Sequence, residues 1–164
     1  MAQQEFILTK TFNVSKEMVF DAFATAEALA QWWGPVEAPI DVVSLDFRPE
    51  GIFHYRMKGT HISYGIFRYK KIERPNSITW INSFADENGV IIKPPFKDLD
   101  LPKEILNTVT LTETNGVTTL VLKSEPLHAS ASEINCFYSI TQGMEQGFGS
   151  TFNQLADYLN KIQK

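Results

Sequence analysis

The side chains best suited to nucleophilic or metal chemistry are few in this sequence, and their spacing is wrong for either. Cys136 is the single cysteine. It falls on the apolar side of a helical pattern, which favours a buried structural thiol over a nucleophile. None of the three histidines, His54, His61 and His128, has a second ligand at metal-site spacing, so surface positions are expected for them. We therefore predict no catalytic residue, no metal site and no cofactor.

Acidic pairs and glycine-rich segments add little chemistry. Asp86-Glu87 and Asp98 to Asp100 fall in turn-like segments, whereas general acid-base catalysis needs a carboxylate in an apolar cleft. Gly147-Phe148-Gly149 lies inside a helical pattern and not after a strand, so it is no phosphate-binding loop. The sequence thus favours a protein that is not an enzyme.

Large apolar side chains are the better candidates for function. They alternate along predicted strands and face a predicted helix, which is typical of a cleft for a small apolar ligand. The predicted ligand-binding residues are Trp33, Phe53, Tyr55, Met57, Tyr64, Trp80, Phe84, Met144 and Phe148. The alternative is that these side chains fill one another's space as a solid core.

Trp32 and Trp33 are adjacent at the end of a predicted helix. Neighbouring helical residues point about 100° apart, so at most one should face the core fully. We expect the other to be half exposed, at the mouth of a cavity or on a partner surface.

The elements that must position these residues follow from periodicity and capping signals. Phe6 to Phe12 alternates as a strand, and Ser15 and Thr25 can cap two short helices, the second ended by Gly34. Strand patterns follow at 43–47, 53–58, 64–72, 78–84, 107–114 and 117–123, the last two joined by a favourable Asn-Gly turn. Residues 85–106 show no periodicity and form either a functional loop or an irregular connection.

The C-terminal segment predicts one long helix over residues 134–162. Ser130 and Glu133 form a capping-box pattern just before it. Its apolar stripe consists of Cys136, Ile140, Met144, Phe148, Phe152, Leu155, Leu159 and Ile162. Gly143, Gly147 and Gly149 predict a bend or a close backbone approach, or else a helix that begins later.

These elements predict an α+β fold in a single domain over residues 1–164. A strongly curved antiparallel sheet of about seven strands wraps around the long C-terminal helix, and two short helices follow the first strand.

The net charge of −4 argues against a nucleic-acid partner. No apolar run reaches the ~20 residues of a membrane span. One cysteine and a polar N-terminus favour a cytoplasmic, bacterial-type protein. Exposed strand edges allow a homodimer, but nothing selects one.

Several stretches, in this order, resemble the helix-grip fold of the START-like superfamily, also called SRPBCC. They are Trp33-Gly34-Pro35, residues 46–51, residues 72–80, the hairpin at 107–122, and residues 143–159. Within it, the chain resembles the family named after the C-terminal domain of the heat-shock protein 90 ATPase activator. Two departures are Glu50-Gly51, where the family often has Gly-Gly, and Gly147-Phe148, where it often has Gly-Trp.

The resemblance implies a ligand site between sheet and helix, where superfamily relatives bind lipids, hormones and polyketide-like molecules. The leading hypothesis is a stand-alone, non-catalytic module that binds a small hydrophobic molecule. A second is a co-chaperone-like interaction module with a chaperone as partner, although the chain has no room for the activator's separate N-terminal domain. A third is a cyclase-like or dehydratase-like enzyme with His54, Tyr64 or Asn82 inside the cavity.

Overall fold

The computed structural model describes residues 5–163. Its helices are α1 (Lys16–Ala22), α2 (Ala26–Trp32), α3 (Ala131–Ser139) and α4 (Thr141–Ile162). Its strands are β1 (Phe6–Phe12), β2 (Ile40–Leu45), β3 (Ile52–Lys58), β4 (Ile62–Glu73), β5 (Ser77–Ala85), β6 (Ile91–Ile92), β7 (Glu104–Thr114) and β8 (Val117–Leu127). No helix within residues 5–163 is long and apolar enough to cross a membrane.

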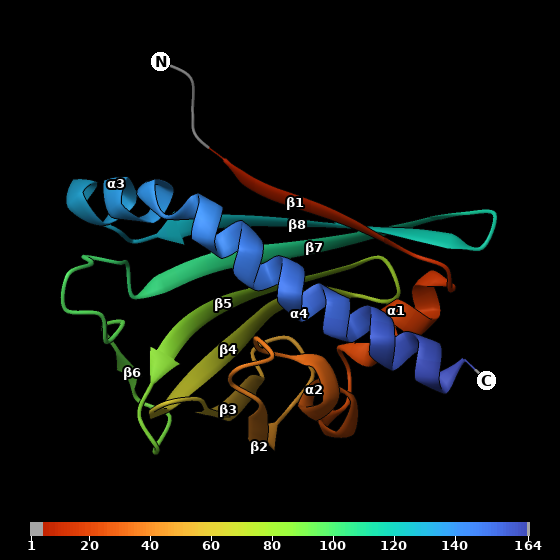
Figure 1. The fold of residues 1–164 in the computed structure, drawn as a ribbon, viewed down its shortest axis with the longest axis horizontal. Coiled ribbons are helices and arrows are strands. Elements are labelled where there is room, and N and C mark those ends of the chain that lie inside the picture. The colour runs from red at the N-terminus through yellow and green to blue at the C-terminus, as the bar shows by residue number, and fades with distance from the viewer. Residues whose placement is uncertain (1–4, 164) are drawn as a thin grey trace.

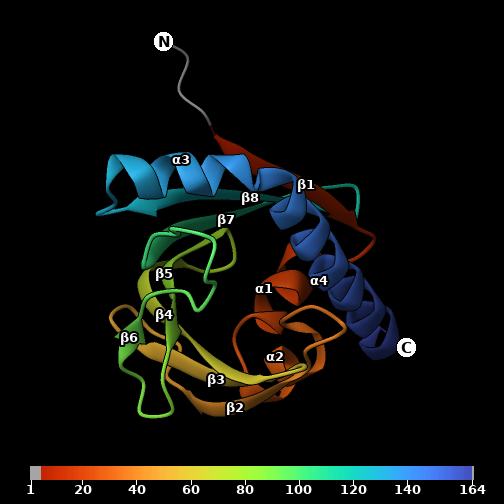
Figure 2. The same ribbon diagram turned by 60° about the vertical axis from the view of Figure 1, so that its left-hand side comes forward.

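The strands form one antiparallel sheet in the order β1-β8-β7-β5-β4-β3-β2, and β6 pairs with the end of β5. Figure 2 shows the sheet curving from β1 and β8 round to β3 and β2. Helix α4 crosses this sheet, with α1 and α2 beside its C-terminal half (Figure 1). The predicted α+β helix-grip arrangement is confirmed.

Local capping signals explain both short helices. Ser15 Oγ accepts a hydrogen bond from the Met18 amide at 3.3 Å, and Thr25 Oγ1 accepts one from the Ala28 amide at 3.2 Å. These bonds satisfy amide groups that the first turn of a helix leaves free. After α2, Gly34 adopts a φ of 90°, which L side chains avoid. The predicted starts and the stop are therefore confirmed.

The tryptophan prediction is wrong, because both rings are buried. Trp32 is 1% exposed and Trp33 is 7% exposed. Helix α2 ends at Trp32, and Trp33 has an extended backbone with φ −74° and ψ 139°. The 100° spacing of a helix therefore does not apply to this pair, and both side chains turn inward. Their rings meet edge to face, 5.6 Å apart.

The C-terminal helix is divided at Ile140, whose φ and ψ of −108° and 15° separate α3 from α4. The Ser130–Glu133 capping box is present. The bend does not lie at the glycines, and a Cβ at Gly143, Gly147 or Gly149 would meet nothing within 4 Å. The predicted close backbone approach at the three glycines is therefore wrong, and the break between the helices falls three residues before the first of them.

The break also changes which residues of the stripe are buried. In α3, Phe137 is buried, whereas Cys136 is only half-buried. In α4, Phe152, Leu155 and Leu159 are buried as predicted, but Ile162 is 46% exposed at the end of the helix. Because α3 and α4 are separate segments, a single 3.6-residue stripe cannot run through both.

The core lies between the sheet and the C-terminal half of α4. Aromatic side chains dominate it, and Trp80 stacks on Phe67 with ring centroids 4.7 Å apart. Fully buried members include Phe20, Trp32, Phe53, Phe67, Tyr69, Trp80 and Phe152. This half of the molecule is solidly packed, and the open space lies elsewhere.

Candidate ligand-binding cavity

A cavity of about 230 Å³ lies between the sheet, α3 and the N-terminal half of α4. The helices contribute Phe137, Ile140, Met144 and Phe148. The sheet contributes Tyr55, Met57, Gly65, Asn82, Ser83, Phe84, Ile105, Asn107 and Ser124. The remaining lining residues, Pro94, Leu101, Pro102 and Lys103, belong to residues 93–103, which we call the rim loop.

Gly65 makes room for the ring of Tyr55 on the cavity wall. The two residues are paired across β3 and β4. A Cβ at Gly65 would lie 2.3 Å from both Cζ and Oη of Tyr55. The ring therefore lies over the glycine, and any side chain there would push it away.

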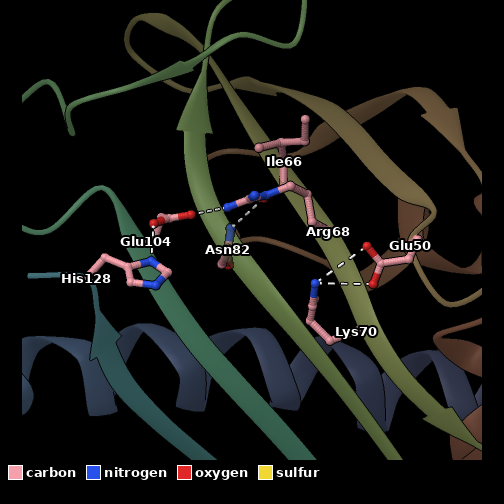
Figure 3. Close-up of polar contacts among 7 residues, drawn as sticks. All are labelled: Glu50, Ile66, Arg68, Lys70, Asn82, Glu104 and His128. Atoms are coloured by element: carbon pink, nitrogen blue, oxygen red, sulfur yellow. Dashed lines mark hydrogen bonds and ion pairs between the residues drawn. The ribbon is translucent and has the colours of Figure 1, made fainter.

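The polar residues on the sheet side of an otherwise apolar lining are Tyr55, Asn82, Ser83, Asn107 and Ser124. Asn82 Nδ2 donates to Tyr55 Oη at 3.4 Å. It also donates to the Ile66 carbonyl at 3.3 Å (Figure 3). Ser124 Oγ donates to Asn107 Oδ1. Burial raises the pKa of the Tyr55 hydroxyl, against the opposing effect of hydrogen bonds from Asn82 and Trp33. Tyr55 is therefore neutral at physiological pH.

Charged groups lie at the rim or on the far face. Lys103 is the one charged side chain among the lining residues described, and it is exposed. Its neighbour Glu104 points to the outer face, where it meets Arg68 and His128 (Figure 3). Hydrogen bonds from His128 and then Arg68 lower the pKa of Glu104 despite its partial burial. These ion pairs lie on the far side of the sheet, away from the cavity.

The rim loop is tied to α3 by an ion cluster of Lys93, Asp100 and Glu133. Lys93 Nζ lies 2.7 Å from Asp100 Oδ1 and also contacts Glu133. Ser132 Oγ donates to Asp100 Oδ2 at 2.6 Å. The cluster joins both ends of the loop to the first turn of α3, beside the cavity.

The predicted site residues separate into three groups. Tyr55, Met57, Phe84, Met144 and Phe148 line the cavity together. Trp33, Phe53 and Trp80 lie in the packed core instead. Phe53 and Trp80 are strand residues, and Trp33, which follows α2, packs against Trp80 with ring centroids 6.3 Å apart. Binding by the lining residues stays a prediction.

Tyr64 does not line the cavity. In the β3–β4 register it lies opposite Arg56, whereas Gly65 lies opposite Tyr55. Tyr64 therefore shares the outer face with Arg56 and His54, because neighbouring residues of a strand point to opposite faces. The expectation that Tyr64 faces the ligand space is corrected by this register.

His54 also points outward, yet it is not a surface histidine. It is only 6% exposed, and its Nε2 lies 3.0 Å from the Asp86 carbonyl oxygen. Tyr64 packs against the ring with centroids 5.5 Å apart. The turn after β5 covers His54, so part of the 85–106 segment closes the outer face. Of the three polar candidates for catalysis, only Asn82 lines the cavity.

The family model described as Activator of Hsp90 ATPase homolog 1-like protein matches residues 13–160. This chain belongs to that family. A comparison with curated proteins found no match.

Solved structures related to this activator-like family member share its fold. One is the solution structure of a protein from Staphylococcus epidermidis, with 28% identity, a TM-score of 0.77, and coverage of 99% of this chain and 93% of that one. Another is a protein from Arthrobacter aurescens, with 24% identity, a TM-score of 0.78, and coverage of 96% and 86%. DynU16, a putative protein in the dynemicin biosynthetic locus, has 16% identity and a TM-score of 0.64, and covers 97% of this chain and 48% of its own.

Sequence reasoning missed several lining residues of this family member. Asn107 precedes Val109 and Leu111 at the inward-facing positions of β7, and all three are buried. A polar residue at a core position of an alternating strand was the available signal. Pro94, Leu101 and Pro102 carried no such signal, because the rim loop has no periodicity.

Proposed function

We propose that this protein is a non-catalytic module that binds a small hydrophobic molecule in the cavity between the sheet, α3 and α4. The supporting observation is the mostly apolar cavity of about 230 Å³. Cavities for drug-sized ligands measure roughly 300–1,000 Å³. The expected ligand is therefore small, with one or two rings or a short alkyl body.

The chemistry of the lining supports binding over catalysis. The lining residues described include no histidine, cysteine or carboxylate. Proton transfer and covalent catalysis usually use such groups. Tyr55 holds its proton, and the ammonium group of Lys103 belongs to an exposed rim residue. The lining can therefore orient a ligand, but it offers no acid–base pair.

The test is a screen of small apolar compounds by native mass spectrometry on wild type and two matched variants. Ile105→Phe adds volume inside the cavity, whereas Ile7→Phe makes the same change at an exposed position of β1. We expect compounds found with the wild type to bind Ile7→Phe equally and Ile105→Phe at least about tenfold more weakly, because overpacking removes their space.

Two results would contradict the proposal. One is a broad library that yields no ligand. The other is a set of ligands whose affinity is the same for Ile105→Phe as for the wild type.

A second candidate function, a co-chaperone-like interaction module, is favoured by family membership. The structural feature that suggested an interaction surface was an exposed tryptophan at residue 32 or 33, and both Trp32 and Trp33 are buried. A heat-shock protein 90 ATPase assay with the purified protein separates this function from ligand binding. Stimulation, or stable association with the chaperone, would favour it.

A third candidate, a cyclase-like or dehydratase-like enzyme acting on a polyketide-type substrate, is supported by Asn82 in the cavity and by the fold shared with DynU16. Any ligand from the screen serves as its test. Conversion of that ligand by the wild type, and not by Asn82→Leu, would support the enzyme.

A further inference from the structure

Asn107 is a buried amide facing the cavity with unused hydrogen-bonding capacity. Only 1% of the residue is exposed, and it lines the cavity. Its Oδ1 accepts from Ser124 Oγ, the residue directly opposite it across β7 and β8. Within residues 5–163, its Nδ2 group donates to no protein atom. A polar group that faces the cavity without a protein partner is a suitable contact for the polar atom of a ligand.

A second donor, the hydroxyl group of Tyr55 on β3, lies near the same region and is reached through Asn82 on β5. Asn82 lies opposite Ile105, and Trp80 lies opposite Asn107, so Asn82 and Asn107 are diagonal neighbours on one sheet face. Such neighbours lie roughly 7–8 Å apart, close enough to contact one small ligand. Asn82 Nδ2 donates to Tyr55 Oη. The hydroxyl hydrogen of Tyr55 has no acceptor among the described residues, so it too is available.

We call these four residues, Tyr55, Asn82, Asn107 and Ser124, the polar band. The band runs across β3, β5, β7 and β8 within an apolar lining. Its free donors are the Asn107 Nδ2 group and the Tyr55 hydroxyl, and none of its members carries a charge. A carboxylate placed there would lose its hydration without gaining a counter-ion, which is unfavourable. A neutral oxygen would satisfy the donors without that cost.

From this arrangement we infer the class of ligand, an inference that rests on the proposed function. The ligand carries an uncharged acceptor oxygen, such as that of a ketone, aldehyde or ester, on an apolar body. Asn107 Nδ2 donates to this oxygen, and the Tyr55 hydroxyl lies on the other side of the band. The apolar body lies against Met144, Phe148 and Phe84.

Three compounds of matched shape test the inference: acetophenone, isopropylbenzene and benzoate. They share one ring and differ in whether the branched end is a ketone, a hydrocarbon or an anion. Affinities are measured by titration with chemical-shift detection. We expect acetophenone to bind about tenfold more tightly than either analogue, the effect of one net hydrogen bond. The hydrophobic effect alone would make isopropylbenzene bind more tightly than acetophenone, because isopropylbenzene is the more apolar molecule.

Variants then assign the preference to the polar band. The double change Asn107→Leu with Ser124→Ala removes both hydrogen-bond partners together, so neither is left unpaired. It should abolish the preference for acetophenone and leave isopropylbenzene binding equal or tighter. Asn160→Leu makes the same asparagine change at an exposed position of α4 and should alter nothing. Tyr55→Phe, a milder change, should reduce the preference and serves if the double variant does not fold.

The outcomes separate the two proposals. If the wild type binds isopropylbenzene as tightly as acetophenone, the polar band holds ordered water only, and the inference is wrong while cavity binding stands. If benzoate binds most tightly, the inference is equally wrong, and Lys103 at the rim becomes the recognising group. If none of the three binds and the library screen is also empty, the proposed function fails and the inference fails with it.

Discussion

Single residues decide the shape of the cavity wall, and Gly65 is the clearest case. Its missing Cβ lets the Tyr55 ring lie flat against β4, where the hydroxyl meets Asn82. The same glycine would be a liability in an ordinary strand, because it has no side chain to pack. Here the vacant side-chain position holds the Tyr55 ring of the neighbouring strand, so the shape of the cavity wall depends on the missing Cβ.

Gly65→Ala should therefore destabilise the protein. The new methyl group would overlap the Tyr55 ring, and forcing extra atoms into a packed site costs about 1–3 kcal/mol. Urea unfolding followed by tryptophan fluorescence measures the change in free energy of unfolding. The matched change Gly143→Ala, in α4 where a Cβ meets nothing, should stabilise by up to about 1 kcal/mol. Equal stability of Gly65→Ala and the wild type would show that the ring can move freely.

At the scale of elements, the rim loop and α3 form one side of the cavity. The Lys93 ion cluster joins them, since Lys93 contacts Asp100 within the loop and Glu133 in the first turn of α3. Glu133 also accepts from the Ser130 amide in the capping box. Exposed ion pairs contribute little to global stability. Their effect here should be local, on how often the loop opens.

Lys93→Met should speed hydrogen exchange of the backbone amides in residues 93–103 several-fold and leave the exchange of β7 and β8 unchanged. The reason is that the loop loses its charged contacts with α3, while the sheet keeps its ladder. Exchange detected by mass spectrometry measures both. Lys97→Met, at an exposed position of the same loop, is the matched control. No difference between the two variants would show that the cluster does not hold the loop.

The pH dependence of the same exchange gives a second measurement. Lys93 lowers the pKa of Asp100 and Glu133 below their ordinary values of 3.8 and 4.5. A carboxyl group with a lowered pKa stabilises the folded form fully above its ordinary value and loses that effect as pH falls through the lowered one. Wild-type rim-loop exchange, corrected for intrinsic rates, should therefore approach that of Lys93→Met only under acidic conditions.

At the scale of the whole molecule, α4 has two halves with different roles. Its C-terminal half closes the aromatic core through Phe152, Leu155 and Leu159. Its N-terminal half borders the cavity through Met144 and Phe148. The two phenylalanines stack on each other with centroids 6.0 Å apart, so the boundary between core and cavity falls between them.

Phe152→Ala should cost about 3–5 kcal/mol, the usual effect of removing a buried phenylalanine. Phe148→Ala should cost clearly less, because its half-buried ring already borders open space, and it should enlarge the cavity. Denaturant unfolding of both variants gives the difference, and the ligand screen should return larger compounds for Phe148→Ala. Equal destabilisation would mean that the cavity is filled by core packing.

Most of the fold could be predicted because its signals are local. Ser15, Thr25 and Ser130 cap helices through backbone amides three residues away. Asn115 and Gly116 adopt the positive φ angles that a tight hairpin requires. Such contacts depend on sequence neighbours alone, so the composition of a short segment suffices to predict them.

The position of the cavity could not be predicted from the sequence, because it depends on how elements far apart in the chain are placed. Phe53 and Tyr55 share one face of β3, and Trp80 and Phe84 share one face of β5. In each pair the first residue lies in the core and the second lines the cavity. Alternation along the sequence determined which face a side chain points to, because that period is a property of the strand itself. Only the path of α4 across the sheet, and the division of the helix at Ile140, decided where side chains pack solidly and where space remains.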